Sequence, residues 1–201
     1  MFVQIIQAKA GDPGGIRKEM DRWMEELSPG AVGSLGATAG ISTDGEFWSV
    51  VRFESEEAAR KNSDRPEQGE WWNEFQKHLD GEATFYESTE IDTIRDGGSD
   101  DAGFVQIMKG RVKDLDKMRS EMKAMEAEMP NRRPDVIGGI SAKISDNEFI
   151  NTMYFTSEAE ARKGEQAMEA APADQGGPNW DELIEEMSFI DIKEPWLFSQ
   201  K

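Results

Sequence analysis

The sequence contains no cysteine and a single histidine, His78, among its 201 residues. The absence of cysteine excludes disulfides, thiolate nucleophiles and cysteine-ligated metal sites. No apolar run approaches the roughly 20 residues that a transmembrane helix needs, and residues 1–6 lack the basic stretch that opens a secretory signal peptide. We therefore expect a cytoplasmic protein that does not enter a membrane.

Basic residues are also scarce, since 23 lysines and arginines face 41 aspartates and glutamates and leave a net charge of −18. A surface of this charge repels phosphate groups, so nucleic acids and anionic membranes are poor partners. Hydrophobic residues make up 37% of the chain and include six tryptophans. This is enough material to form a core, so the composition predicts a globular protein.

The signatures of several enzyme classes are missing as well. Gly33, Gly36 and Gly40 are not followed by the Lys-Ser/Thr pair of a phosphate-binding loop, and there is no G-x-S-x-G nucleophile elbow. The many carboxylates have no His or Cys companions at the spacing of metal ligands. We expect neither a metal ion nor an organic cofactor.

The chain repeats itself with an offset of 102 residues. Residues 2–5, Phe-Val-Gln-Ile, recur at 104–107, and residues 59–61, Ala-Arg-Lys, recur at 161–163. Of the 60 positions from 2 to 61, 19 are identical without a gap, whereas average composition would give about four. The second copy then gains six residues, so that Trp72 corresponds to Trp180. The sequence therefore contains two copies of one unit.

A short acidic segment separates the copies. Residues 95–102, Arg-Asp-Gly-Gly-Ser-Asp-Asp-Ala, are polar, rich in glycine and without periodicity, which is typical of a linker. We predict a first domain of residues 1–94, a linker of residues 95–102 and a second domain of residues 103–201.

The first half of each copy predicts a strand and a helix. Residues 2–9 are mostly apolar at both the odd and the even positions, which is typical of a central strand covered on both faces. Asp12 and Asp114 follow as helix N-caps, and apolar residues then recur at helical spacing. Residues 28–30 and Pro130 should end these two helices.

The second half of each copy predicts a hairpin, an interrupted helix and a last strand. Residues 32–42 and 46–53 should pair through a tight turn at Asp44-Gly45, with residues 146–147 at the equivalent place. Ser55 and Ser157 can cap the helix, which is interrupted near Pro66 and, in the second copy, at residues 172–178. The last strands lie near residues 83–91 and 187–193.

The order β-α-β-β-α-β is the ferredoxin-like arrangement of the α+β class. Helices cover only one face of such a sheet, whereas the first strand is apolar on both faces. The open face must therefore be covered, and a second copy of the same sheet is the nearest cover available. We expect an internal pseudo-dimer, and further homo-oligomerisation stays open.

These features resemble the dimeric α/β barrel superfamily, and within it the antibiotic biosynthesis monooxygenase-like domains. The resemblance is carried by the element order, by the strand from Glu46-Phe47 to Phe53 that leads into Glu-Ser-Glu-Glu-Ala-Ala at residues 54–59, and by the tandem arrangement. It implies two ferredoxin-like βαββαβ units that form an intramolecular dimeric α/β barrel. Relatives include cofactor-independent oxygenases of polycyclic aromatics and heme-degrading monooxygenases.

The heme-degrading relatives resemble one another in an Asn on the first strand, a Trp early in the last helix and a His further along it. This chain has Gln4 and Asn62 at or near the first two positions, and only His78 matches. The second copy has Gln106, Gly164 and Glu186, none of which matches. Heme degradation is therefore not expected.

Three polar residues are candidates for a site. His78 lies seven and three residues after Trp71 and Phe75, on one face of the predicted helix, and could act as a general base. A partly exposed histidine or a structural hydrogen bond remains open. Gln4 and Gln106 stand in apolar strands, where a buried amide needs partners. They could hydrogen-bond across the pseudo-dimer or contact a ligand.

Aromatic residues could line an apolar cavity suited to a flat aromatic ligand, or they could simply form the core. The candidate ligand-binding residues of this kind are Trp71, Trp72, Phe75 and Trp180, with Phe47 and Phe149 beside them.

Two functions of different class follow. The first is the binding of a small apolar or aromatic molecule. The second is cofactor-independent monooxygenation, in which O₂ reacts with a bound electron-rich aromatic and the protein supplies desolvation and a base. We expect any site in the first copy, reached by Gln4, Trp72 and His78, because the second copy has Asn179, Glu186 and the longer stretch 172–178.

Overall fold

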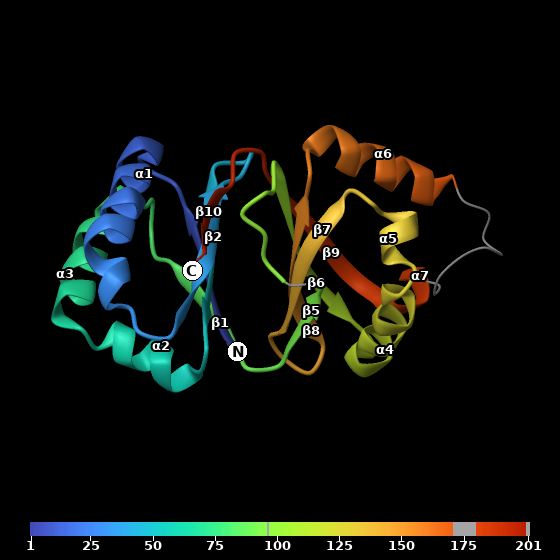
Figure 1. Cartoon of the computed structure of the whole chain (residues 1–201), viewed down its shortest axis with the longest axis horizontal. Coiled ribbons are helices and arrows are strands. Elements are labelled where there is room, and N and C mark those ends of the chain that lie inside the picture. The colour runs from blue at the N-terminus through green and yellow to red at the C-terminus, as the bar shows by residue number, and fades with distance from the viewer. Residues whose placement is uncertain (96, 171–179, 200–201) are drawn as a thin grey trace. The chain divides into compact units, whose positions relative to one another are not determined.

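The computed structural model describes residues 1–95, 97–170 and 180–199 of the chain, which falls into two compact units. Unit 1 comprises Met1–Ile91 and Trp196–Lys201, and unit 2 comprises Asp92–Pro195. Each unit is a five-stranded antiparallel sheet with its helices on one face (Figure 1). The predicted α+β class and the ferredoxin-like units are confirmed, whereas the closure of the sheets into a barrel stays a prediction.

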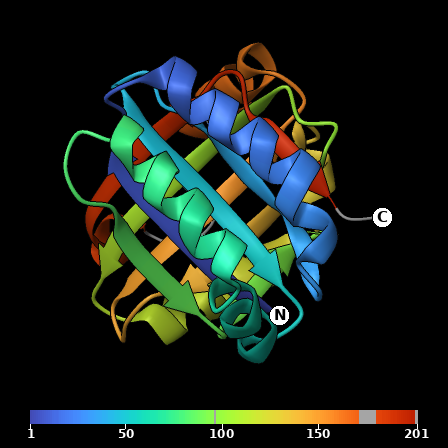
Figure 2. The ribbon, with the colours of Figure 1, turned by 90° about the vertical axis from the view of Figure 1, so that its left-hand side faces the viewer.

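Unit 1 has the strand order β10-β2-β3-β1-β4. Helices α1 and α3 lie side by side over one face of this sheet (Figure 2). In chain order the elements are β1 (Phe2–Lys9), α1 (Pro13–Arg22), the π-helical turn η1 (Trp23–Leu27), the 3-10 turn η2 (Ser28–Gly30), β2 (Ser34–Ile41), β3 (Glu46–Phe53), α2 (Glu56–Ser63), α3 (Pro66–Phe75), the 3-10 turn η3 (Gln76–His78), β4 (Thr84–Ser88) and β10 (Trp196–Ser199).

Unit 2 has the equivalent order β5-β7-β8-β6-β9. Strands β7 and β8 and helix α6 begin at residues 136, 148 and 158, which is 102 residues after β2, β3 and α2. In chain order the elements are β5 (Ile91–Ile94), β6 (Phe104–Val112), α4 (Leu115–Glu126), α5 (Met129–Arg132), β7 (Val136–Lys143), β8 (Glu148–Phe155), α6 (Glu158–Glu169), α7 (Trp180–Leu183) and β9 (Ile184–Ile192).

The two short strands β5 and β10 were not expected from the sequence. β10 adds to the edge of the unit 1 sheet, where Trp196 pairs with Ala39 and Ser199 with Gly36 of β2. β5 adds to the edge of the unit 2 sheet beside β7. The predicted boundaries 1–94, 95–102 and 103–201 place these strands differently, and a division into separately folding domains stays a prediction.

The predicted helix starts agree with the structure. Asp12 and Asp114 accept the backbone N–H three residues on, at 3.1 and 2.9 Å, and Ser55 and Ser157 do the same at 3.2 Å. The break between α2 and α3 falls at Pro66, as expected. The stretch 172–178 and Asn179 lie outside the described residues.

One local expectation is corrected, and the first hairpin agrees with its prediction. Pro130 does not end a helix, because α4 ends at Glu126 and Pro130 lies in the first turn of α5, where its missing N–H is tolerated. The first hairpin turns at the predicted place, through the three residues 43–45, since the Ser42 N–H donates to the Glu46 carbonyl at 2.8 Å. Gly45 takes a φ of +81°, as such three-residue turns require.

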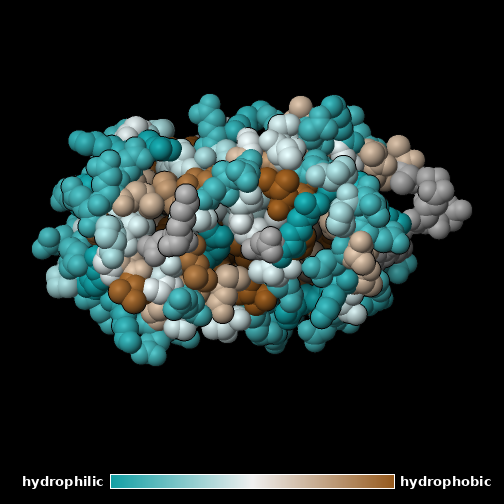
Figure 3. Space-filling model, viewed as in Figure 1, coloured by the Kyte–Doolittle hydropathy of each residue, from teal (hydrophilic) through white to brown (hydrophobic). Residues whose placement is uncertain are grey.

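The faces of β1 decide where the core of unit 1 lies. Phe2 packs with Phe53 and Ala59 under α2, so alternate residues of β1 from Phe2 face the helices. On the opposite face Val3 and Ile5 are 0% and 1% exposed, so this strand is covered on both faces as predicted. Hydrophilic residues predominate on the molecular face drawn in Figure 3, as the acidic composition implies.

Candidate functional site

An aromatic cluster fills the space between the sheet and the helices of unit 1. Trp71 and Phe75 of α3 are 6% and 0% exposed, and their ring centroids are 4.9 Å apart. Phe75 lies 5.2 Å from Phe47 of β3. The indole N–H of Trp71 donates to the Glu19 carbonyl of α1 at 2.9 Å, which satisfies its buried polar atom. These side chains are core residues that join α3 to α1 and to the sheet.

The cluster reaches the surface where Trp72 meets Phe85. Trp72 is half-buried and stacks on Phe75, with 5.3 Å between the centroids and 20° between the ring planes. Its ring lies 5.4 Å from that of Phe85. Phe85 is 45% exposed, since β4 is the edge strand of the sheet. We call Trp72 and Phe85 the aromatic surface.

A cluster of three polar side chains lies beside Phe85 on the same face of the sheet. It consists of Gln4, Arg60 and Glu87, and we call it the polar group. Gln4 of β1 pairs with Glu87 of β4, and its amide donates to Glu87 Oε1 at 2.9 Å. Arg60 of α2 donates to both carboxylate oxygens of Glu87, at 3.1 and 2.5 Å. Glu87 is two residues from Phe85, so both point to the helix-covered face of the sheet. The aromatic surface and this polar group therefore adjoin.

The polar group sets the charge state of Glu87. Partial burial raises the pKa of this carboxyl, but hydrogen bonds from Arg60 and Gln4 outweigh burial and hold the pKa below its ordinary value. Glu87 is therefore a carboxylate at neutral pH and a weak base. It can orient a donor group of a ligand, whereas it is poorly suited to remove a proton.

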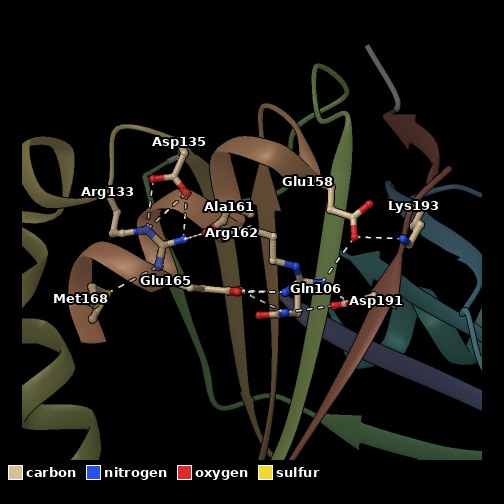
Figure 4. Close-up of polar contacts among 10 residues, drawn as sticks. All are labelled: Gln106, Arg133, Asp135, Glu158, Ala161, Arg162, Glu165, Met168, Asp191 and Lys193. Carbon is tan, nitrogen blue, oxygen red and sulfur yellow. Dashed lines mark hydrogen bonds and ion pairs between the residues drawn. The ribbon is translucent and has the colours of Figure 1, made fainter. Parts of the chain in front are cut away.

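Unit 2 contains a corresponding polar group, shown in Figure 4. The Gln106 amide donates to Asp191 at 3.0 Å and to Glu165 at 3.4 Å. Arg162, 102 residues after Arg60, binds Asp191 and lies 3.0 Å from Glu165. Each glutamine amide thus has its partners within its own unit, and a hydrogen bond across the two copies, one of the two alternatives left open, is not needed to satisfy it.

His78 has a structural position at the start of α1. Its Nδ1 lies 3.1 Å from Oδ2 of Asp12, and its carbonyl accepts the N–H groups of Gly11 and Asp12 at 2.9 and 2.8 Å. The side chain is 29% exposed. Trp71 and His78 both face α1, because Trp71 donates to the Glu19 carbonyl and His78 lies beside Asp12, but His78 stands in the 3-10 turn η3 that follows the end of α3 at Phe75.

The structure does not bring His78 to Gln4. His78 contacts the chain at Gly11, beyond the end of β1 at Lys9, whereas Gln4 lies five residues before that end, a distance of about 16 Å along the strand at roughly 3.3 Å per residue. Of the residues expected to share one pocket, Gln4 and Trp72 lie near each other through Phe85 and Glu87. His78 lies at the other end of the strand.

The corresponding region of unit 2 is arranged differently. Phe189 of β9 pairs with Met108 as Phe85 pairs with Ile6, and it is 60% exposed. Trp180 packs instead into the cluster of Val112, Leu115, Met118 and Phe149. Within residues 97–170 and 180–199 no ring contact joins Trp180 to Phe189.

Two residues of this site were missed because the sequence signal was weak. Phe85 and Phe189 are 104 residues apart, and so are Glu87 and Asp191. The gapless match at an offset of 102 ends near residue 61. Comparison of the copies beyond that point, with an offset of 104, would have identified both the repeated Phe and the repeated carboxylate.

Unit 1 also contains a small hollow. Its volume of about 10 Å³ is room for roughly one water molecule. It lies between the π-helical turn η1 and strands β2 and β10, and its lining residues are Trp23, Met24, Ser28, Ser34, Gly36, Ala37, Phe198 and Ser199.

Neither metal ligation nor membrane crossing is indicated in the described part of the chain. No group of three or more His, Cys, Asp or Glu residues there could hold a metal ion. No helix there combines the length and the apolar character needed to cross a membrane.

The fold has counterparts among solved structures, although no protein-family model and no curated protein matches the sequence. A provisionally assigned monooxygenase from Lactobacillus acidophilus NCFM superposes with a TM-score of 0.71 at 13% identity, over 98% of both chains. A second one, from Fusobacterium nucleatum subsp. nucleatum, gives 0.79 at 9% identity, over 100% of this chain and 94% of the other. An anthrone oxidase-like protein gives 0.60 at 10% identity, over 98% and 92%.

Identities of 9–13% show a shared fold and carry no residue roles from one protein to another. The matches extend over nearly the whole of each chain, so both units are included. The chain has the two-unit ferredoxin-like fold of these proteins.

Proposed function

We propose that unit 1 binds a small, flat, largely apolar molecule on the aromatic surface of Trp72 and Phe85. The observation that carries this proposal is the exposure of Phe85, 45%, beside rings that continue into a buried cluster. Rings held in place by a core lose little conformational freedom when a flat ligand stacks on them.

The neighbouring polar group would orient the ligand. Small-molecule sites combine an apolar lining with a few placed polar groups. The Glu87 carboxylate, held by Gln4 and Arg60, can accept a hydrogen bond from a hydroxyl or N–H at one end of the ligand. A flat aromatic with a polar substituent on its rim fits this arrangement.

The proposal places the site in unit 1 rather than in unit 2. Phe189 is the counterpart of Phe85, but Trp180 packs into another cluster. An isolated exposed ring offers one contact where the pair in unit 1 offers two. This difference also supplies a matched control for the experiment.

The test is equilibrium binding of anthrone, a flat three-ring compound and the one after which a structural neighbour is named. We expect Phe85→Ala and Trp72→Ala to weaken binding at least tenfold, about 1.4 kcal/mol. Phe189→Ala in unit 2 should leave the affinity unchanged. The proposal is wrong if Phe85→Ala binds like the parent, or if Phe189→Ala or Trp180→Ala removes binding.

Monooxygenation is the second candidate function, supported by the provisional assignments of two structural neighbours. With anthrone the reaction balances as anthrone plus O₂ to anthraquinone plus water, with one oxygen atom entering the ring system. Such a reaction needs a base that faces the ligand, and the low pKa of Glu87 argues against it in this role. We therefore expect no oxygen uptake above the protein-free rate. Uptake that Phe85→Ala abolishes would establish the enzyme instead.

A further inference from the structure

Arg52 of β3 is a buried arginine without an anionic partner. It is 7% exposed, and its buried Nε has no hydrogen-bond partner in the described part of the chain. Its Nη2 donates to the Phe198 carbonyl of β10 at 3.5 Å, which is the outer limit for such a bond. No ion pair joins Arg52 to a carboxylate of residues 1–95, 97–170 or 180–199.

Arg133 shows how the same chain satisfies a buried arginine elsewhere. It is 9% exposed, and it donates from Nε to Asp135 Oδ1 at 3.1 Å and from Nη2 to Oδ2 at 2.8 Å (Figure 4). Asp135 is itself 7% exposed. This two-point pairing is the arrangement that a guanidinium and a carboxylate prefer. The chain has 41 acidic residues, and none of the described ones serves Arg52 in this way.

The backbone beside Arg52 is shaped to leave space for its guanidinium. Gly36 of β2 pairs with Arg52, next to a bulge between Ser34 and Gly36. Its φ of +124° favours glycine. A Cβ at this position would stand 2.7 Å from Nη2 of Arg52 and 2.1 Å from the Phe198 carbonyl oxygen. Any larger residue would therefore displace the guanidinium or strand β10.

An arginine occupies this position of the sheet in unit 1 but not in unit 2. The corresponding position of unit 2 is Tyr154, 102 residues later, which pairs with Gly138. A buried tyrosine carries no charge at neutral pH, so the fold does not need an arginine at this place. Arg52 therefore calls for an explanation other than packing.

Arg52 is also separate from the aromatic surface. Phe53 packs with Phe2 and Ala59 under α2, so Arg52, its neighbour in the strand, points to the opposite face of the sheet. The function proposed above and a role of Arg52 can therefore fail or hold independently.

We propose that Arg52 is the receptor of a small carboxylate, bound through the Nε edge of the guanidinium. A buried charge without a partner is strongly unfavourable, and an anion from solution would remove that penalty. The planar guanidinium matches a carboxylate with two parallel hydrogen bonds. The 7% exposure of Arg52 limits the ligand to acids whose carboxyl group is carried by little bulk, of the size of acetate.

The direct test is a titration of the full chain with sodium acetate at constant ionic strength, observing the arginine Nε–H signals by NMR. We expect the Arg52 signal to shift and saturate, while that of Arg133, already paired with Asp135, stays in place. Sodium chloride at the same ionic strength should not reproduce the shift. The absence of a saturable acetate shift at Arg52 overturns the proposal.

A stability measurement provides the second test. In the parent and in the exposed control Arg111→Gln, acetate should raise the unfolding midpoint with saturation. In Arg52→Tyr, which copies the residue of unit 2, the apparent affinity for acetate should fall at least tenfold. An unchanged acetate dependence in Arg52→Tyr contradicts the proposal. If this variant does not fold, the NMR titration of the parent decides.

Discussion

Asp12 accepts two hydrogen bonds that fix the start of α1 and tie it to the 3-10 turn η3. They come from the Gly15 N–H and the His78 ring, each at 3.1 Å. These bonds hold the pKa of Asp12 below its ordinary value of 3.8, and the bond from Gly15 contributes more than the bond from His78. We expect His78→Ala to raise the pKa of Asp12 toward 3.8, as measured by NMR titration of the carboxyl carbons. Asp114, a cap without a histidine, is the control.

The same bond makes a prediction for stability against pH. A carboxyl whose pKa is lowered by folding stabilises the fold above its unfolded pKa, and the effect disappears as pH falls through the folded pKa. His78→Ala should therefore lower the unfolding midpoint at neutral pH, and the gap to the parent should close below pH 3.8. A gap that persists in stronger acid would show that His78 acts through packing.

At the residue scale, the sequence predicted which side chains require hydrogen bonds, but it did not identify the residues that supply them. The glutamines at 4 and 106 were expected to require hydrogen bonds, and both make them. Their acceptors, Glu87 and Asp191, lie more than 80 residues away and are brought close only by strand pairing. No local sequence pattern encodes such a partner, so the sequence alone could not identify Glu87 and Asp191 as the acceptors.

At the element scale, two glycines inside helices make opposite predictions. Nothing lies within 4 Å of a Cβ built on Gly69 of α3, whereas a Cβ on Gly164 of α6 would stand 2.3 Å from Nε of Arg133. Arg133 cannot yield, because Asp135 and the Ala161 carbonyl hold it. Gly69→Ala should stabilise the protein by about 0.5–1 kcal/mol, and Gly164→Ala should destabilise it by about 1–3 kcal/mol.

Urea denaturation of both variants checks this pair. Both substitutions change the helix propensity in the same way, so any difference in sign must come from the surroundings of the new methyl group. Equal effects of the two substitutions would show that Arg133 is free to move, which the contacts with Asp135 argue against.

The elements that were predicted have strong local signals, and those that were missed have weak ones. The strand at residues 2–9 and the hairpin strand at 46–53 were expected with the bounds that β1 and β3 have, because eight apolar or alternating residues specify a strand. β5 and β10 have four residues each. So short a run has no measurable periodicity, and each pairs with a strand that is distant in sequence.

At the scale of the whole molecule, the repeat revealed two similar units and concealed an exchange between them. Each sheet receives a fifth strand from a segment outside its own βαββαβ order: β5 follows the last strand of unit 1, and β10 follows the last strand of unit 2. A comparison of the two copies treats every position as belonging to its own copy. It therefore cannot show that residues 196–199 complete the first sheet.

Strand β10 should accordingly stabilise unit 1, although its residues are far in sequence from the rest of that unit. Truncation after Pro195 removes the pairing with residues 36–39 of β2 and the contact of Trp196 with Phe47, whose ring centroids are 6.4 Å apart. We expect the unfolding midpoint to fall by about 5–10 °C. Amide exchange should accelerate in β2 and stay slow in β7, its counterpart in unit 2.

Two further variants separate the backbone pairing from the side chains. Trp196→Ala keeps the strand but loses the aromatic contact and the cation–π contact with Arg17 at 4.9 Å, so it should show part of the effect. Leu197→Ala changes a side chain on the opposite face and should keep β2 protected. A peptide of residues 195–201 added to the truncated chain should restore protection, because the edge of β2 is left unpaired. If the backbone amides of β2 exchange as slowly in the truncated chain as in the parent, β10 does not stabilise unit 1 and this prediction is wrong.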